Sequence, residues 1–386
     1  MPLDVVQIRA QVDGASEDNS ARSKCRTLQS LDSSRLVSIE GSRIKLLKTL
    51  TLPKSGKSNK IQGISWAPPG PHENRLGFAR QDHFVGIYDV SKNCGVYGCR
   101  SPWTQCVALH PVRDLVLTGG MSNAVTMWGA GDRLGELQEV AKLVEHDGYI
   151  SSLHFLGRGD RFITSSGDAD VRVFDIEKRV CIMRMCGHEK DAQSISFAQD
   201  DVMGPYKRFA TCSSDKTVKL WDLTSGRCTH SFKSESELNG CAMFPNGNMV
   251  AAGGEKDKTY VFDVRAYSLA SKYARNNQKT ASLAWSKSGR HLYVGHDDGA
   301  IITWDIFSSG ENKMYASKVE AHLTRQPDGR PDITNSRVQE LSVNHDGVLA
   351  SCGFDGCVNI WTASDEAGGK GKAKGKRAPV SNPIPI

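Results

Sequence analysis

The sequence lacks any long apolar run. No stretch of its 386 residues approaches the roughly 20 uninterrupted apolar residues of a membrane-spanning helix. The segment from Met1 to Ala10 also lacks a basic stretch followed by an apolar one, so we expect no secretory leader. Hydrophobic residues make up 39% of the chain and charged residues 24%, an ordinary balance for a globular protein that buries a sizeable core. We therefore expect a soluble, cytoplasmic protein.

The sequence also lacks the short motifs of common enzyme and cofactor sites. It contains neither a Gly-x-x-x-x-Gly-Lys-Ser/Thr phosphate loop nor a Gly-x-Ser-x-Gly nucleophile elbow. Zinc sites need ligands two to four residues apart together with a second such pair or nearby histidines, a requirement that the scattered cysteines do not meet. We predict no catalysis, no cofactor, no metal and reduced, buried thiols. Three cysteine pairs share one wider spacing, and they are Cys94/Cys99, Cys181/Cys186 and Cys352/Cys357.

Positive charge is concentrated at the C-terminus. The formal net charge is +6, and half of the excess lies between Asp365 and Ile386, where Gly alternates with Lys. The rest of the chain is only mildly basic, so we expect no nucleic-acid binding. Alternating Gly and Lys cannot form a core, and we expect residues 364–386 to be a flexible tail. Its lysines are either merely solvated or make a weak contact with an anionic membrane.

A pattern that ends in an aromatic residue occurs seven times. Its copies lie about 40 to 57 residues apart, near the period of WD repeats, in which each unit forms one four-stranded propeller blade. In the fourth copy, Ala192 to Phe197 and Arg208 to Cys212 read as strands, Asp215 lies in a turn of small residues, and Thr217 to Trp221 reads as a third strand. The aromatic residues are Tyr88, Trp128, Phe174, Trp221, Phe262, Trp304 and Trp361.

The last copy has no fourth strand of its own. It ends at Trp361 and Thr362, and only the tail follows. A spare β-prone segment, Ile44 to Thr51, precedes the first copy. Its pairing with the last blade would close the ring and remove exposed sheet edges. We therefore predict an all-β, seven-bladed WD-repeat β-propeller over residues 43–363, preceded by a segment over residues 1–42 that contains a degenerate helix.

Polar residues of the fourth copy resemble a catalytic triad. His188, Thr211 or Ser213, and Asp215 are the residue types of a hydrolase. In WD repeats, however, such residues form a buried hydrogen-bond network with the blade tryptophan, and that network satisfies them. We expect weaker networks where Glu145 precedes His146 and where Lys233-Ser234 replaces Gly-His. The residues assigned to these structural networks are His188, Asp215, Trp221, Asp168, Asp298, Trp304, Asp355 and Trp361.

Several stretches lie outside the generic repeat and resemble one family. They are Arg100-Ser-Pro-Trp-Thr-Gln-Cys-Val-Ala, His146-Asp-Gly-Tyr-Ile-Ser-Ser, Ile163-Thr-Ser-Ser-Gly-Asp, Phe244-Pro-Asn-Gly-Asn, Phe262-Asp-Val-Arg-Ala and Ser286-Lys-Ser-Gly-Arg. Through them the chain from about Arg43 to Thr362 resembles the β subunit of heterotrimeric G proteins. The resemblance implies a signal-transducing role without catalysis. It also implies a GDP-bound α subunit, a γ subunit and effectors as partners, and a location at the inner face of the plasma membrane through those partners.

In that family one face of the propeller grips the α subunit, and the resemblance places twelve residues there. They are Lys60, Trp103, Gln105, Met121, Asn123, Asp147, Tyr149, Asp191, Glu237, Asn239, Glu255 and Phe354. Gln62, Gln105 and Gln193 replace an aromatic residue and two methionines of the family pattern, so we expect a more polar face. Trp103 is either an interface anchor or a cap on its blade's core.

The N-terminal segment distinguishes between two candidate functions. In the resembled family an amphipathic N-terminal helix forms a coiled coil with the γ subunit, and Ile8, Val12 and Ala15 have the spacing of its seam. Gly14 and the polar residues after it interrupt that stripe. The alternative is a WD-repeat adaptor of another multiprotein complex. One more departure from the family is an insertion at 324–334, expected to protrude as a loop.

Overall fold

The computed structural model of the chain describes residues 29–31, 44–51, 60–101, 103–130, 136–198, 208–275, 277–307, 317–324, 332 and 336–363. The expected N-terminal helix, the expected tail and most of the expected loop at 324–334 lie outside these residues. Thr324 and Ser336, at the base of that loop, are joined by a hydrogen bond of 2.8 Å between the Thr324 amide and the Ser336 hydroxyl.

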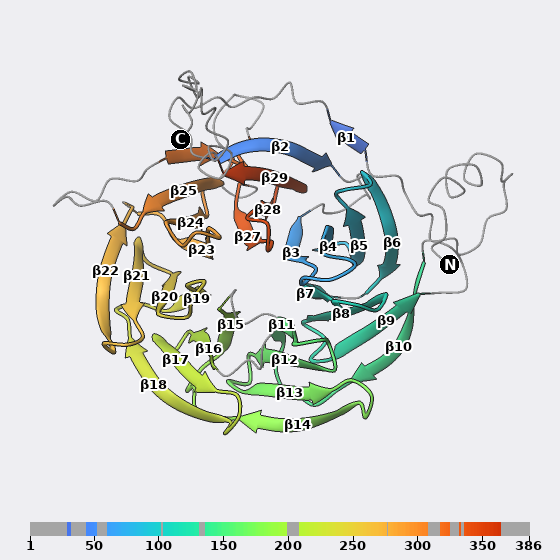
Figure 1. Cartoon of the computed structure of the whole chain (residues 1–386), viewed down its shortest axis with the longest axis horizontal. Helices are drawn as coiled ribbons and strands as arrows, with labels where there is room; N and C mark the ends of the chain where they lie inside the picture. The colour runs from blue at the N-terminus through green and yellow to red at the C-terminus, as the bar shows by residue number, and fades with distance from the viewer. Residues whose placement is uncertain are drawn as a thin grey trace, which may run out of the picture.

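Seven antiparallel sheets stand around a central channel like the blades of a propeller (Figure 1). Blade 1 comprises β3 (Ile61–Trp66), β4 (Arg75–Arg80), β5 (Phe84–Asp89) and β6 (Cys94–Arg100). Blade 2 comprises β7 (Thr104–Leu109), β8 (Leu115–Gly120), β9 (Val125–Ala130) and β10 (Leu137–Leu143). Blade 3 comprises β11 (Ile150–Leu156), β12 (Arg161–Ser166), β13 (Val171–Asp175) and β14 (Val180–Met185). Blade 4 comprises β15 (Ala192–Phe197), β16 (Arg208–Ser213), β17 (Thr217–Asp222) and β18 (Arg227–Lys233).

The remaining blades complete the ring. Blade 5 comprises β19 (Leu238–Met243), β20 (Met249–Gly254), β21 (Lys258–Asp263) and β22 (Ser268–Ala274). Blade 6 comprises β23 (Thr280–Trp285), β24 (His291–His296), β25 (Ala300–Asp305) and β26 (Ser317–Glu320). Blade 7 comprises β27 (Val338–Val343), β28 (Leu349–Gly353), β29 (Cys357–Ala363) and β2 (Ile44–Thr51), with β1 (Gln29–Leu31) beyond β2. The prediction of an all-β, seven-bladed propeller is confirmed.

The innermost strand of every blade contains a bulge at its second residue. In β3, for example, the pairing with β4 jumps from Ile61 to Gly63, and the same shift recurs in β7, β11, β15, β19, β23 and β27. A bulge bends its strand and leaves one residue without a partner in the ladder. Seven such residues are therefore repeated around one end of the channel.

The ring closes through β2, as the spare N-terminal segment predicts. It pairs antiparallel with β29 from Ile44 opposite Ala363 to Thr51 opposite Cys357. In Figure 1 the blue β2 lies directly outside the red β29. The Thr49 hydroxyl also donates to the Asn359 side-chain oxygen at 2.7 Å. The first part of the chain thus supplies the outer strand that the last repeat lacks.

Between each pair of neighbouring blades lies one buried hydrophobic cluster. The seven repeat aromatics are all buried, and Trp221, for example, packs with Phe209 and Ile195 between blades 3 and 4. Residues of β2 join two clusters, because Ile44 packs between blades 6 and 7 and Leu50 packs between blades 7 and 1. The closing strand therefore contributes to the core on both sides of blade 7.

Within the segment 1–42 only Gln29–Leu31 are described, and they form a strand that pairs with β2 and that the sequence did not predict. One expectation needs correction. The thiols are not all buried, since Cys186, directly after β14, and Cys228, in β18, are exposed. All cysteines among the described residues are free. No helix in the described part of the chain has the length and hydropathy to cross a membrane.

Truncating a buried residue of the closing strand should destabilise the whole ring. Leu50 is 1% exposed, and Leu47 in the same strand is 53% exposed. We expect Leu50→Ala to lower the free energy of unfolding by about 2–5 kcal/mol, because it leaves a cavity between blades 7 and 1. The matched change Leu47→Ala should cost no more than about 0.5 kcal/mol. Urea unfolding monitored by tryptophan fluorescence measures both, and equal effects would contradict closure by a packed β2.

Candidate partner-binding site

The residues of the fourth blade that resemble a catalytic triad form a closed hydrogen-bond network. His188 lies 2.8 Å through Nδ1 from Asp215 Oδ2 and 2.7 Å through Nε2 from Thr211 Oγ1. The Trp221 indole donates to the same Thr211 oxygen at 2.8 Å. With its proton on Nδ1, His188 donates to Asp215 and accepts from Thr211, so every polar group has a partner. Burial lowers the pKa of His188, which keeps the imidazole neutral. The arrangement positions the blade and leaves no free nucleophile.

Other blades keep this network to different degrees. Blade 3 retains the contacts from His146 to Asp168 and to Thr164, both at 2.8 Å, although Glu145 precedes the histidine. Blade 7 has the complete set, which the sequence did not indicate in full. There His322 contacts Asp355 at 2.9 Å and Ser351 at 2.8 Å, and Trp361 donates to Ser351 at 2.9 Å.

Blade 6 departs from the expected network. The carboxylate of Asp298 binds the guanidinium of Arg275 rather than a histidine. Trp304 packs against Tyr273 with the ring centroids 5.0 Å apart. An ion pair thus occupies the place of the neutral contact between imidazole and carboxylate.

One contact links the loops of each pair of neighbouring blades at the end of the channel where the inner strands begin. We call these seven contacts the junction ring. Blades 2 and 3 meet through Asn123, whose side chain donates to the Asp147 carbonyl, and blades 3 and 4 meet through Tyr149 and Asp191. The other five contacts are His83 with Trp103, Lys190 with Glu237, Glu255 with Lys279, Asp297 with Arg337, and Phe354 with Lys60.

The twelve residues that the resemblance placed on one face all lie in or beside this ring. Trp103, Asn123, Asp147, Tyr149, Asp191, Glu237, Glu255, Phe354 and Lys60 are members of it. Met121 donates its amide to the Trp103 carbonyl, Asn239 donates to Glu255 at 3.2 Å, and Gln105 lines the channel just inside. Residues from six blades are therefore brought to one end of the propeller.

Trp103 protrudes from this face. Its side chain is 64% exposed, so it does not cap the core of its blade. The backbone has a positive φ of 56°, and the amide donates to His83 Nδ1 at 2.9 Å. The His83 ring lies edge-on to the indole, 5.5 Å away. Met121, 54% exposed, lies beside it. A large, fixed aromatic surface next to a flexible thioether is typical of an interface anchor.

The side chains of blades 3 and 4 hold one another beside the channel. The Tyr149 hydroxyl donates to Asp191 at 2.8 Å and accepts from the Gln193 amide at 3.0 Å. Burial, together with the bond to Asp191, raises the pKa of Tyr149 to about 12. The phenol is therefore neutral at physiological pH. Tyr149 and Gln193 thus present an uncharged rim, with the Asp191 carboxylate at its edge.

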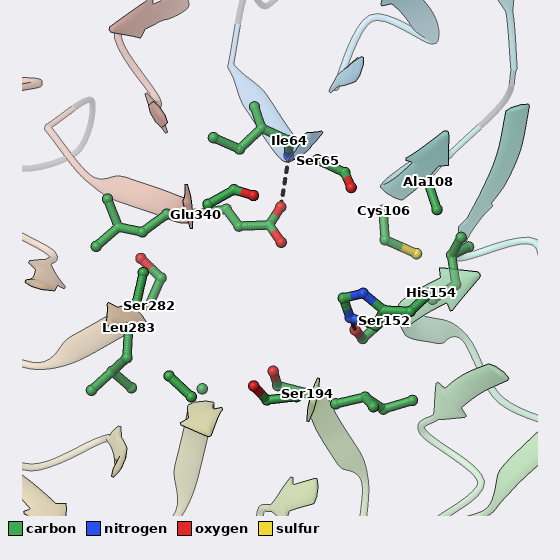
Figure 2. A pocket seen from close by; sticks show the side chains of 18 of the residues that line it. Ile64, Ser65, Cys106, Ala108, Ser152, His154, Ser194, Ser282, Leu283 and Glu340 are labelled. Atoms are coloured by element: carbon green, nitrogen blue, oxygen red, sulfur yellow. Dashed lines mark hydrogen bonds between the residues drawn. The ribbon is translucent and has the colours of Figure 1, made fainter. Parts of the chain in front are cut away.

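The central channel has a volume of about 730 Å³ and is lined mainly by the inner strands. Figure 2 shows the Glu340 carboxylate, from β27, and the His154 imidazole, from β11, projecting into it from opposite sides. Glu340 Oε2 accepts from the Ile64 amide at 2.7 Å. Burial raises the pKa of Glu340 to about 7 and lowers the pKa of His154 to about 4. The channel thus contains a carboxyl group that resists ionisation and a neutral imidazole.

These two residues were missed at the level of sequence. Much of the lining consists of Ser, Ala and apolar side chains, among them Ser152, Ser194 and Ser282. A bulge reverses which residues of a strand face the channel, so alternation along Val338 to Val343 does not predict the position of Glu340. The absence of catalysis remains a prediction.

Glu340, which is half-buried in the channel wall, should make stability depend on pH. Its carboxyl ionises near pH 4.5 in the unfolded chain and near 7 in the folded protein. Between these values the folded state keeps a proton that the unfolded state has lost, so this contribution to stability is lost as pH rises from about 4.5 to 7. Glu340→Gln keeps an acceptor for the Ile64 amide and removes the charge. We expect the variant to be more stable than wild type at pH 8 by about 1–3 kcal/mol, with no difference at pH 4.5.

Urea unfolding of both proteins at several pH values measures this difference. Subtracting the free energy of unfolding of wild type from that of the variant at each pH removes the contribution of His154, because His154 is present in both proteins. A difference that does not change with pH would contradict the burial of an ionisable group at Glu340.

Comparison with known proteins agrees with this geometry. Residues 94–275 match the family model of the nucleolar protein 10-like N-terminal domain, and residues 275–305 match the WD domain, G-beta repeat. A guanine nucleotide-binding protein subunit beta of Zea mays is 26% identical, with 80% of this chain and 82% of the relative covered. The protein of the same name from Solanum tuberosum is 27% identical over 79% and 81%. The one from Saccharomyces cerevisiae is 24% identical over 85% and 82%. Seven four-stranded blades, the His188–Asp215 type of network and these matches identify the chain as a WD40-repeat β-propeller.

Proposed function

We propose that this chain is the β subunit of a heterotrimeric guanine nucleotide-binding protein. In this proposal it binds the GDP-bound α subunit, pairs with a γ subunit and contacts effectors when the α subunit leaves. The observation that carries the proposal is the placement of the twelve expected residues at one end of the channel, from Lys60 in blade 1 to Phe354 in blade 7. Relatives that bear the name of this subunit cover about four fifths of the chain, which supports it further.

The proposed role is that of a scaffold without catalysis. The residues that resemble a catalytic triad are engaged in structural contacts, as His188 and Asp215 illustrate. No group of three or more His, Cys, Asp or Glu side chains that could hold a metal occurs in the part of the chain that the structure describes. The proposal includes a cytoplasmic location at the inner face of the plasma membrane, reached through the partner subunits, and a weak contact of the C-terminal lysines with that membrane.

A second candidate is a WD-repeat adaptor of another multiprotein complex. The match of residues 94–275 to the nucleolar protein 10-like domain favours this candidate. So do Gln62, Gln105 and Gln193, which make the channel mouth polar where the family that the sequence resembles has apolar and aromatic residues. The two candidates differ in their partners. Purification of the native protein with its bound chains distinguishes them, because only the first requires a guanine nucleotide-binding α subunit and a small coiled-coil subunit.

Trp103 provides the sharpest test of the proposed face. We expect Trp103→Ala to weaken binding of a GDP-loaded α subunit by at least roughly thirtyfold, because loss of an anchoring aromatic costs about 2 kcal/mol or more. Phe307→Ala is the matched control. Phe307 is also 64% exposed but follows β25, at the opposite end of its blade from the junction ring. Biolayer interferometry with the α subunit loaded with GDP and then with a GTP analogue measures both variants.

The proposal fails if wild type shows no preference for the GDP form, or if a folded Trp103→Ala binds as tightly as wild type. Asp191 lies at the edge of the same face, so Asp191→Asn should act mainly on the association rate and its salt dependence. Unfolding midpoints of all variants show whether each still folds.

A further inference from the structure

A ring of carboxamides lines the channel just inside the junction ring. The second residue of each inner strand is the one that the bulge leaves without a pairing partner, and all seven of these residues line the channel. Five of the seven are carboxamides, which we call the amide ring, and the other two are Ser151 and Ala281. The amide ring consists of Gln62, Gln105, Gln193, Asn239 and Gln339.

The amide ring has hydrogen-bonding capacity to spare. Gln339 Oε1 is buried and has no hydrogen-bond partner among the described residues. Gln193 and Asn239 use their amide N–H groups on Tyr149 and Glu255, which leaves their side-chain carbonyl oxygens as acceptors. Buried polar groups without partners are costly. The unpartnered Gln339 oxygen, with the acceptor oxygens of Gln193 and Asn239 nearby in the ring, therefore favours a polar ligand that donates hydrogen bonds at the mouth.

Carboxamides match the chemistry of a peptide backbone. Each offers an N–H donor and a C=O acceptor without a net charge, as does a peptide group. An extended segment presents such groups at regular intervals and is commonly bound through them. The amide ring can therefore form hydrogen bonds with the backbone of a bound peptide without burying a charge. It discriminates poorly among the side chains of that peptide.

A carboxyl group that can discriminate among ligands by charge lies deeper in the channel, next to the amide ring. Glu340 follows Gln339 in β27 and points into the channel (Figure 2). It makes no ion pair with any described residue. Two pairs of opposite charges have formed at the mouth, since Glu255 binds Lys279 and Arg337 contacts Asp297. Glu340 is thus an uncompensated carboxyl in a cavity of about 730 Å³, within the range of roughly 300–1,000 Å³ for ligand pockets.

We infer that the channel mouth binds an extended segment of a partner protein that inserts a Lys or Arg side chain. The amide ring holds the backbone of this segment, and Glu340 pairs with the inserted cation. The inference rests on the proposal that this face binds proteins, and it specifies the kind of segment bound. It does not depend on the identity of the partner, because both candidate functions bring a protein to this face.

Short peptides test the inference with the full-length chain. The probes are fluorescein-labelled Gly-Gly-Arg-Gly-Gly and the same peptide with citrulline, which has nearly the shape of arginine but no charge. Fluorescence anisotropy at pH 8 measures their affinities. We expect the arginine peptide to bind at least about tenfold more tightly than the citrulline peptide, as one desolvated charge pair provides.

Two variants separate the roles of the carboxyl group and the ring. Glu340→Gln should abolish the preference for arginine and leave binding of the citrulline peptide unchanged. The double variant Gln62→Leu/Gln105→Met should weaken binding of both peptides by the same factor, about fivefold or more, while the preference remains. An unfolding midpoint for each variant excludes misfolding as the cause.

The comparison of the two peptides on wild type decides the inference without any variant. Equal affinities, or no binding of either peptide up to millimolar concentration, overturn it. A preference for arginine that persists in Glu340→Gln overturns the role of that carboxyl group. If the α subunit does not bind but the arginine preference is found, the proposed subunit function fails and the channel site stands. If the α subunit binds and the preference is absent, the channel inference alone fails.

Discussion

The pairing of β2 with β29 is the constraint on which the whole molecule depends. The chain supplies seven repeats, but the last repeat stops at its third strand, so the sheet of blade 7 is complete only when Ile44–Thr51 returns to it. Leu50 then fills the space between blades 7 and 1. Blades 2 to 6 each pack against a neighbour on both sides. The pairing of β2 with β29 gives blades 1 and 7 a neighbour on both sides as well. The channel and both of its mouths exist only because the ring is closed.

Most of the fold could be predicted because it repeats. The aromatic positions from Tyr88 to Trp361 mark the blades, and the expected strands in blade 4 begin at the residues where β15, β16 and β17 begin. The closing strand could be predicted because its eight residues form a β-prone segment and the last repeat lacks a fourth strand. Gln29–Leu31 was missed, since three residues contain no periodic pattern and their strand forms only when β2 offers a free edge.

The candidate site was predictable in a different way. Ten of the twelve residues lie in loops before inner strands or after second strands, and Gln105 and Asn239 lie at the second position of inner strands. Repeat symmetry therefore brings all twelve to one end once the blades are counted. The interior of the channel was not predictable. The bulges decide which side chains face inward, and Glu340 and His154 become channel residues only through that local geometry. Arg275 replaces a histidine as the partner of Asp298, a substitution visible only when the two loops are placed together.

The contact between Lys60 and Phe354, 4.5 Å from the ammonium nitrogen to the ring centroid, spans the seam at which the ring closes. Lys60 belongs to the first blade and Phe354 to the last. Any protein bound over them therefore contacts both blades and holds them together. Bound protein then suppresses the local opening by which the ring would begin to unzip. Amide hydrogens of β2 should exchange more slowly in the complex, although β2 lies at the outer edge of its blade, far from the mouth. Occupancy of one face thereby governs the lifetime of the closed ring.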